Sequence, residues 1–423
     1  MKALFVLFAI FTIINAASLK IEEEKVNYEG YKVYKVNIAN KEQRAVIHQL
    51  ATNLELSIWH EDREHIDLMV NPKQQSVFSN LTFARGIENY EMISNLQSLI
   101  NEEQKSVDSL DNTEFTWTRY HKLPEIETFI DNILSKYSAV AQEFVIGQSY
   151  EGRKIRGIKI SYKSGNPGIF IEANIHAREW ITSATATWFI NELLTSSDTN
   201  VRNLAENYDW YIVPVLNVDG FVYSHEKDRL WRKTRQPIAH STCIGTDGNR
   251  NFDSYWGIEG GSSTNPCDYD YAGPKAFSEP EIKGLADYLQ ANKNKLNILI
   301  AFHSYSQVLL SPYGHTTEEL PENYEDLMKV AKAYADAVGV LPYATKYTYG
   351  TSAGSMYLAS GATIEYAYNE VDIKITYTVE MRDTGRYGFV LPPVQILPNC
   401  EETMTGLMAL VKESEQLGYL KLK

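Results

Sequence analysis

The run IHAREW, from Ile175 to Trp180, places a histidine and a glutamate three residues apart. His176 and Glu179 could hold a metal ion together, since imidazole nitrogens and carboxylate oxygens are zinc ligands. The pattern H-x-x-E alone also fits two ordinary loop residues, so a third donor is needed. His303, in AFHSYS, is the candidate. Two imidazoles and one carboxylate, with a fourth position left for water, make a catalytic zinc site.

A catalytic zinc ion also needs a base and groups that hold the substrate. Glu380, in ITYTVEMRD, lies at the end of a strand-like alternation and is the candidate base. Arginines gather in RLWRKTR and DGNRNFD, and Arg178 lies inside IHAREW. Arginine recognises carboxylates through two parallel hydrogen bonds. Each arginine taken singly also fits a surface ion pair, and His303 alone also fits a buried structural histidine.

Apolar runs that predict buried strands lead up to both histidines. GIFIEANI precedes His176, KLNILIAF precedes His303, and DWYIVPVLNV is a third run of strand length. EIETFIDNILSKY and EIKGLADYLQANK show helical periodicity. The alternation predicts an α/β domain with a mixed, largely parallel central sheet flanked by helices. Ligand sites in such sheets lie at the carboxyl ends of strands, where both histidines are expected.

The N-terminal part of the chain has a different pattern. Lys2, the apolar residues 3–14 and the small residues 15–17 predict a signal peptide over 1–17. The apolar run is shorter than the about 20 residues needed to span a bilayer, and a buried helix is the alternative. YKVYKVNI, LELSIW and HIDLMV then alternate like strands, and NYEMISNLQSLINEEQK has apolar residues at helical spacing. These segments predict a small α+β domain that ends in an exposed polar linker.

Composition narrows the function classes. The 423 residues carry a formal net charge of −14, which argues against a nucleic-acid partner. No later stretch is long and apolar enough for a membrane span, so we expect a soluble, secreted protein. Cys243 and Cys267 bracket a Gly-, Asn- and Ser-rich loop, where an oxidising compartment favours a disulfide. Cys400 remains as a buried free thiol, and Asn80 begins a glycosylation sequon, N-L-T.

Five separated motifs carry a resemblance to a known family. HAREW, RLWRKTR, DGNRNFD, FHSYSQ and VEMRDTGRYGF occur in the order and approximate spacing of the secreted zinc metallocarboxypeptidases of the carboxypeptidase A and B group. The likeness runs from about Phe115 to the C-terminus, and the N-terminal domain resembles the inhibitory prosegment of that family. The resemblance implies a digestive-type procarboxypeptidase, with residues 18–105 as prosegment and 106–423 as catalytic domain.

The resemblance also implies roles for single residues. One zinc ion per chain would be held by His176, Glu179 and His303. Glu380 would be the general base that acts on the zinc-bound water, and Arg232 would stabilise the oxyanion of the scissile carbonyl. Asn249 and Arg250 would bind the C-terminal carboxylate of the substrate, and Tyr357 would close over the substrate. Arg178 and Tyr305 would line the neighbouring subsites. Asp247 would orient one of the histidine ligands.

In the family that the chain resembles, enzymes that prefer apolar C-terminal residues have an aliphatic residue at the floor of the side-chain pocket. Enzymes that prefer basic C-terminal residues have an acidic residue there. Ile364 falls at that floor position and Glu365 follows it, so a shift of one residue would reverse the preference. Leu310, Gly314, Ala359 and Thr378 match the apolar-preferring pattern. Ser352 departs from the bulkier aliphatic residue expected there. Because a lysine buried against Ile364 would leave its charge unpaired, we expect release of C-terminal aromatic and aliphatic residues.

Lys105 is the only basic residue between Tyr90 and Arg119, so we expect a trypsin-like protease to activate the precursor there. Peptide and protein C-termini are the expected partners, with no nucleic-acid or membrane partner, and the chain is expected to be a monomer. Three other functions share part of the pattern: an inactive binding protein with the same fold, the related branch that trims other amides such as bacterial-type cell-wall peptides, and a secreted storage or structural protein. The full set of expected zinc ligands with Glu380, Arg250 and Tyr357 favours the digestive type.

Overall fold

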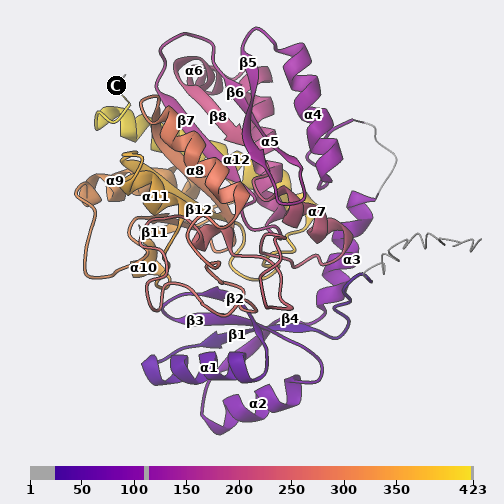
Figure 1. Ribbon diagram of the computed structural model, residues 1–423. Helices are drawn as coiled ribbons and strands as arrows, with labels where there is room; N and C mark the ends of the chain where they lie inside the picture. Colours follow the sequence, from indigo (N-terminus) through magenta and orange to yellow (C-terminus); the bar gives the residue numbers. More distant parts are fainter. Residues whose placement is uncertain (1–23, 109–113, 421–423) are drawn as a thin grey trace, which may run out of the picture.

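A computed structural model of the chain describes residues 24–108 and 114–420. The expected signal peptide, residues 1–17, lies outside the described residues. Residues 24–108 form a small domain, and residues 114–420 form a larger α/β domain (Figure 1). The sheet of the small domain lies between two of its helices, α1 and α2, and the larger domain (Figure 1).

The small domain is a four-stranded antiparallel sheet in the order β2-β3-β1-β4. Its elements are β1 Lys32–Asn37, α1 Lys41–Asn53, β2 Ser57–Glu61, β3 His65–Val70, α2 Gln75–Ala84, β4 Asn89–Ile93 and α3 Leu96–Val107. Alternation along β3 divides its side chains between two faces. Ile66 and Leu68 pack under the helices with Ile47 and Phe78. The other face meets the larger domain.

Two features of the small domain differ from the sequence-based expectation. The strand pattern gives no sign of α1 and α2, which follow β1 and β3. The run expected to form one helix is divided: Ile93 of β4 pairs with Val33, and α3 begins only at Leu96. The side chain of Asn95 accepts from the backbone N–H of Ser98 and caps the helix. Because α3 continues to Val107, Lys105 lies in a helical turn and not in an extended linker.

The larger domain is built on an eight-stranded mixed sheet in the order β11-β10-β12-β9-β7-β8-β6-β5. The central pairs β12–β9, β9–β7 and β7–β8 are parallel, and antiparallel pairs flank them. The strands are β5 Ala141–Gln148, β6 Lys154–Ile160, β7 Gly168–Ala173, β8 Asp209–Val213, β9 Leu296–Ser304, β10 Val308–Ser311, β11 Thr348–Thr351 and β12 Ile375–Met381. The expected fold class is therefore confirmed.

Helices cover both faces of this sheet (Figure 1), so β7 and β9 are buried over their whole length. This burial explains why both strands are continuous apolar runs. The helices are α4 Leu123–Lys136, α5 Trp180–Thr195, α6 Thr199–Asn207, α7 Val218–Glu226, α8 Pro280–Asn292, α9 Tyr324–Gly339, α10 Ser352–Ser355, α11 Thr363–Asn369 and α12 Ile396–Gln416, with short 3₁₀ turns η1 Gly248–Arg250 and η2 Pro393–Gln395.

Parallel pairing brings three chemically important segments to one edge of the sheet. Glu380 of β12 lies directly opposite His303 of β9. β7 is the other neighbour of β9, and His176 follows the end of β7 at Ala173. Paired residues of neighbouring strands project to the same face of a sheet. His303 and Glu380 therefore face the same side, next to the loop that carries His176.

Candidate metal centre and substrate cleft

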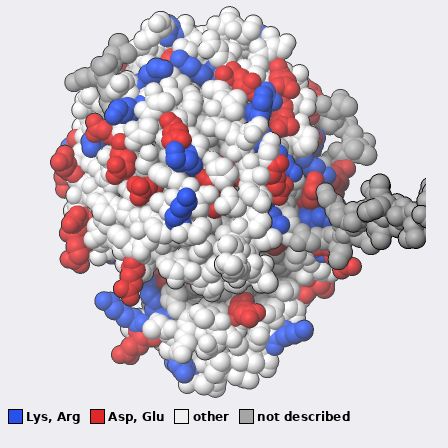
Figure 2. Space-filling view, viewed as in Figure 1, with Lys and Arg blue, Asp and Glu red and all other residues white. Residues whose placement is uncertain are grey.

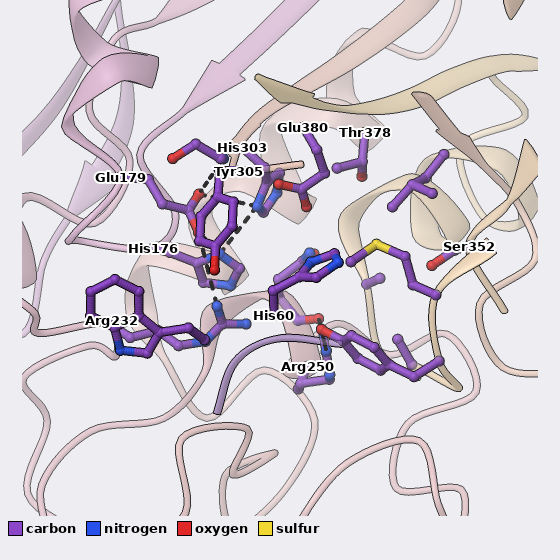
Figure 3. Close-up of a pocket in the computed structure, with 18 of the residues that line it drawn as sticks. His60, His176, Glu179, Arg232, Arg250, His303, Tyr305, Ser352, Thr378 and Glu380 are labelled. Atoms are coloured by element: carbon purple, nitrogen blue, oxygen red, sulfur yellow. Dashed lines mark hydrogen bonds and ion pairs between the residues drawn. The ribbon is translucent and has the colours of Figure 1, made fainter. Parts of the chain in front are cut away.

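His176, Glu179 and His303 bring their metal-binding atoms together in the interior (Figure 3). Glu179 Oε1 lies 2.8 Å from Nδ1 of His176, and Glu179 Oε2 lies 3.3 Å from Nδ1 of His303. The two Nδ1 atoms are 3.1 Å apart, and all three residues are buried. A divalent cation would satisfy these converging donors at once, and the donor set fits zinc. Within residues 24–108 and 114–420, this is the one such cluster of three groups.

The turn between β7 and α5 sets the spacing of the first two donors. Asn174 follows β7 with a φ of 59°, a left-handed conformation that asparagine adopts more readily than most residues. Its amide donates to the carbonyl of Glu179 at 3.2 Å, and the Thr182 hydroxyl donates to the same carbonyl at 2.7 Å. Glu179 is the N-cap of α5. The H-x-x-E spacing therefore spans a fixed turn, which no helical pattern in the sequence reveals.

Asp247 lies behind the donors and orients two neighbours. Its Oδ1 is 3.0 Å from Nε2 of His176, which leaves the Nδ1 of that ring facing Glu179 and His303. Its Oδ2 accepts from Arg232, from Nε at 3.1 Å and from Nη2 at 2.8 Å. Burial acts to raise the pKa of Asp247, but the charges of Arg232 and His176 outweigh it and keep that pKa well below the usual range. Asp247 is therefore an anion at neutral pH.

Glu380 faces the same cavity as the three donors (Figure 3). Burial raises the pKa of Glu380 to about 8, against the lowering effect of the nearby His303. A divalent cation at the neighbouring donors would bring this pKa down again, because its charge favours the carboxylate. A buried carboxylate with a pKa near neutrality is suited to accept a proton and to give it back.

Arg250, Asn249 and Tyr357 form a second polar group in the cavity. Arg250 Nη2 donates to the hydroxyl of Tyr357 at 3.3 Å, and Arg250 Nε has no partner among the described residues. Asn249 Oδ1 accepts from the backbone N–H of Thr363 at 2.9 Å and from its hydroxyl at 3.2 Å. Since Oδ1 is occupied, the amide nitrogen of Asn249 remains for the cavity. Two donors next to each other suit a carboxylate.

Apolar side chains line the part of the cavity beyond Arg250. Ile364, the first residue after Thr363 in α11, is among them, whereas Glu365 is not. Glu365 turns away, and its Oε1 accepts from the backbone N–H groups of Gly314 and His315 at 2.6 and 3.1 Å. The lining residues are Leu310, Ser352, Met356, Ala359, Ala362, Ile364 and Thr378.

Two residues expected at the site do not line the cavity themselves. Arg178 is buried, with its guanidinium 3.8 Å from the centre of the Phe389 ring, and Phe389 is the residue that lines the cavity. Gly314 packs behind Ala359: a Cβ at this position would lie 2.8 Å from the carbonyl oxygen of Ala359. A side chain at Gly314 would therefore displace the backbone of Ala359, which lines the pocket.

The small domain enters the cavity along β2. His60 (Figure 3) and Trp59 are lining residues, and the centre of the Trp59 ring lies 5.1 Å from that of Phe389. Next to them, the Tyr305 hydroxyl donates to Asp67 of β3 at 2.7 Å. The space left at the site is about 70 Å³, which is less than the roughly 150 Å³ cavity that accepts a benzene ring. With the small domain in place, the space at the site is therefore smaller than a cavity that holds a benzene ring.

A buried ion pair fastens α3 to the larger domain. Glu103 accepts from Arg229 Nη2 at 2.9 Å and also from Arg229 Nε, and both side chains are only 1% exposed. Arg229 donates further to the backbone carbonyls of Arg178 and Phe389. The pair therefore joins the two domains beside the cavity.

Replacing Glu103 with alanine is expected to weaken the docking of the small domain by about 3 kcal/mol, because it leaves Arg229 buried without a counter-charge. Urea unfolding of the full chain measures this loss, as an earlier unfolding transition of the small domain. Glu102→Ala is the matched control, since Glu102 lies on the exposed side of the same helix. Equal destabilisation by both variants would contradict the assignment.

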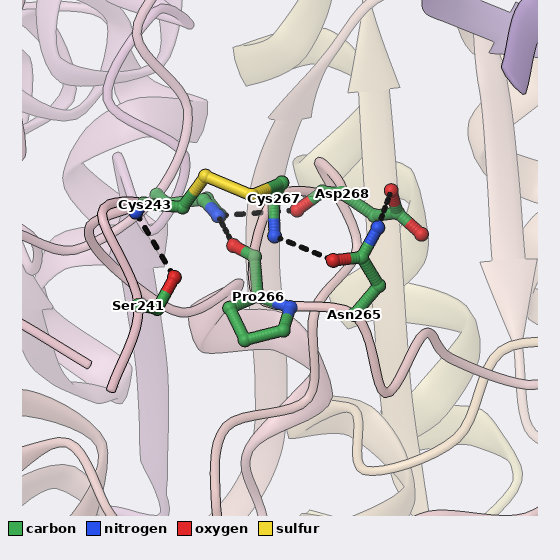
Figure 4. The surroundings of a disulfide bond; sticks show 7 residues. Ser241, Cys243, Asn265, Pro266, Cys267 and Asp268 are labelled. Atoms are coloured by element: carbon green, nitrogen blue, oxygen red, sulfur yellow. Dashed lines mark hydrogen bonds between the residues drawn. A yellow bond between two sulfur atoms is a disulfide. The ribbon is translucent and has the colours of Figure 1, made fainter. Parts of the chain in front are cut away.

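The loop with the cysteines is closed as expected. Cys243 and Cys267 form a disulfide (Figure 4). The backbone N–H of Cys243 donates to Ser241 and that of Cys267 to Asn265. Cys400 is a buried free thiol whose Sγ lies 3.8 Å from the hydroxyl of Thr185.

Several lining residues carry no signal in the sequence. Thr363 does not line the cavity but donates to Asn249 and to Glu172, whereas Trp59 and His60 reach the cavity from a separate domain. Met356, Ala362 and Phe389 resemble ordinary core residues. The docking of β2 brings Trp59 and His60 to the cavity, and neither this docking nor the positions of the other lining residues follow from spacing along the chain.

Both domains of the chain match known protein families. The family described as zinc carboxypeptidase matches residues 126–406, and the carboxypeptidase activation peptide family matches residues 34–103. A zinc carboxypeptidase of Simulium vittatum is 49% identical over 71% of this chain and 98% of its own length. The zinc carboxypeptidase A 1 of Anopheles gambiae is 38% identical over 96% and 94%. The crystal structure of a carboxypeptidase A from Helicoverpa armigera superposes with a TM-score of 0.83, at 26% identity over 93% and 100%.

None of the helices in the described ranges is both long and apolar enough to cross a membrane.

Proposed function

The chain belongs to the zinc carboxypeptidase family and is a metallocarboxypeptidase with an activation peptide; from this membership we propose that it releases C-terminal aromatic and aliphatic residues with one zinc ion per chain. The observation that carries the proposal is the convergence of the buried His-Glu-His donors, Glu380 and Arg250 on one cavity. The same cavity continues into an apolar pocket. Metal, base, carboxylate site and pocket are the parts that such a reaction needs.

The proposed chemistry divides between the metal and the base. Zinc held by His176, Glu179 and His303 would supply Lewis acidity, which polarises the scissile carbonyl and makes a water molecule more acidic. Glu380 takes the proton from the attacking water and delivers it to the leaving amine. Proton transfer of this kind needs a carboxylate close to the metal. Glu380 lies beside the three donors in the cavity, and the charge of a bound cation would favour its ionised form.

Two arginines bind oxygen atoms of the substrate, one at the scissile carbonyl and one at the terminal carboxylate. Arg232, fixed by Asp247, stabilises the negative charge that develops on the carbonyl oxygen. Arg250 and the amide nitrogen of Asn249 bind the terminal carboxylate, which an internal peptide bond lacks. Tyr357, within hydrogen-bonding distance of Arg250, covers the bound residue. The reaction is thereby confined to C-termini.

Peptides that differ only in their last residue test this function. The activated enzyme is expected to release C-terminal Phe and Leu and to leave Lys, because an ammonium group has no counter-charge beside Ile364. Chelation is expected to abolish release, and added zinc is expected to restore it. Faster release of Lys than of Phe would contradict the proposed specificity, and full activity after complete metal removal would contradict the mechanism.

We also propose that residues 18–105 are an inhibitory prosegment, that 106–423 form the catalytic domain, and that residues 1–17 direct secretion. Trp59 and His60 in the cavity, and the small space left beside them, support the inhibitory role. The disulfide supports an oxidising compartment. In this proposal, the protein acts as a monomer on the C-termini of peptides and proteins.

Cleavage after Lys105 by a trypsin-like protease is expected to start activity. Lys105 is exposed in the last turn of α3, between the buried Glu103 and Val107, so its side chain is open to a protease that must unwind this turn to bind the segment. The measurement is activity against a C-terminal Phe peptide during trypsin treatment, together with the N-terminal sequence of the product. Lys105→Ala is expected to prevent both the cut at this bond and the rise in activity. Unchanged activity after complete removal of residues up to 105 would contradict the inhibitory role.

A further inference from the structure

The apolar pocket contains two hydroxyl groups among its otherwise aliphatic lining. Ser352 and Thr378 line the cavity together with Leu310, Met356 and Ile364. Neither hydroxyl makes a hydrogen bond with any residue in the described ranges. Both lie on the side of the pocket away from Glu179 and Arg232 (Figure 3). On the proposed function, this side of the pocket would face the substrate side chain.

The sheet register fixes both hydroxyls in this pocket. Thr378 of β12 pairs with Leu310 of β10, and Leu310 pairs on its other side with Gly350 of β11. Directly paired residues project to the same face, so Thr378 and Leu310 form one wall. The chain leaves β11 at Thr351 and starts α10 with Ser352, which closes that wall. The two hydroxyls are thus held by secondary structure on either side of the Leu310 side chain.

Ser352 has a short side chain, and Gly314 lies next to it. A Cβ on Gly314 would lie 3.2 Å from Ser352 Oγ and 3.4 Å from its Cβ. The serine and glycine together leave room where a bulkier aliphatic residue would fill the pocket. The extra space is bordered by a polar atom, so an apolar side chain that fills it would cover a hydroxyl without giving it a partner. Such a buried unpaired hydroxyl costs free energy.

We propose that Ser352 and Thr378 make this pocket selective for C-terminal tyrosine over phenylalanine. The inference rests on the proposed function, of which it specifies the substrate. A tyrosine ring fills the aliphatic part of the pocket, and its phenol can donate one hydrogen bond and accept another. Phenylalanine covers the same hydroxyls and satisfies neither. A site that hydrogen-bonds a substrate hydroxyl discriminates against the analogue that lacks it.

The test compares four peptides that end in tyrosine, p-methylphenylalanine, phenylalanine or leucine, with the zinc-loaded enzyme released from its precursor. p-Methylphenylalanine has nearly the size of tyrosine but no hydroxyl, so it separates hydrogen bonding from volume. We expect kcat/KM for tyrosine to exceed that for p-methylphenylalanine and phenylalanine by about two- to tenfold, the effect of one or two neutral hydrogen bonds. Ratios within one enzyme preparation cancel any error in active enzyme concentration.

Ser352→Ala is expected to bring the ratio of tyrosine to p-methylphenylalanine to within about twofold of one. Thr378→Val, which keeps the shape of the side chain, is the second variant and is expected to lower the same ratio. Ser355→Ala is the matched control, because Ser355 ends the same short helix and does not line the cavity. It is expected to keep the native ratio.

Equal rates on tyrosine and p-methylphenylalanine in the native enzyme would overturn this inference and leave the proposed function intact. An unchanged ratio in both Ser352→Ala and Thr378→Val would overturn it too. Failure to release any of the four residues would instead contradict the proposed function. The two failures are therefore distinguishable in one series of measurements.

Discussion

Glu380→Gln is expected to lower kcat about 10²- to 10⁴-fold while zinc remains bound, which is the usual contribution of a general base. Glutamine has the size of glutamate and keeps a carbonyl oxygen in the cavity, but it cannot take a proton from water. Because Glu380 lies opposite His303 and is not one of the three converging donors, the metal site is expected to persist. The measurements are kcat on a C-terminal Phe peptide and zinc content per chain.

Glu281→Gln is the control for the loss of a buried carboxyl as such. Glu281 lies in α8, outside the cavity, and burial raises its pKa to about 7, close to the value for Glu380. This variant is expected to keep activity. A Glu380→Gln enzyme that retains zinc and native activity would contradict the role of Glu380. Loss of zinc together with activity would point instead to a part for Glu380 in holding the metal.

Arg250→Met is expected to lower kcat/KM for free-acid peptides about 10²- to 10³-fold, as truncation of a buried, hydrogen-bonded charge pair usually does. Methionine keeps most of the aliphatic stem, so the change removes chiefly the guanidinium. The native enzyme is expected to act on free acids and hardly at all on peptides with an amidated C-terminus. In the variant, the ratio between the two substrates is expected to fall toward one.

Arg235→Met serves as the matched control for Arg250→Met. Arg235 belongs to the motif RLWRKTR, but its guanidinium stacks on Tyr223 and Trp231, and it does not line the cavity. It is expected to retain the preference for free acids. If Arg250→Met also retained that preference, the proposed carboxylate site would be wrong.

The pattern of the chain was sufficient to predict which strands carry the candidate site. GIFIEA and LNILIAFHS are continuous apolar runs because helices bury both faces of β7 and β9, and buried parallel strands leave this trace in any sequence. The polar residues that follow or end such strands, His176 and His303, then stand out by contrast. The specific chemistry of zinc coordination made a histidine–glutamate pair with a distant histidine a testable set.

In the small domain, by contrast, the sequence pattern was not sufficient to predict every element. The sequence pattern did not predict its helices α1 and α2 or the division of residues 89–107 into β4 and α3, because apolar spacing is ambiguous over short segments until a cap such as Asn95 is placed. Lys105 was expected in a linker and lies in a helix, which changes how a protease must reach it.

The sequence by itself determined the family, the mixed α/β fold and the residue types that can bind zinc. These depend on local apolar patterns and on short motifs that can be recognised although they lie far apart in the chain. Only the tertiary structure decided that Glu365 turns away from the pocket while Ile364 lines it, and that Thr363 holds the amide of Asn249. The same holds for Trp59 and His60 in the cavity and for the pair Glu103–Arg229. These contacts join segments far apart in the chain, and their energies depend on burial and register, for which sequence spacing gives no rule.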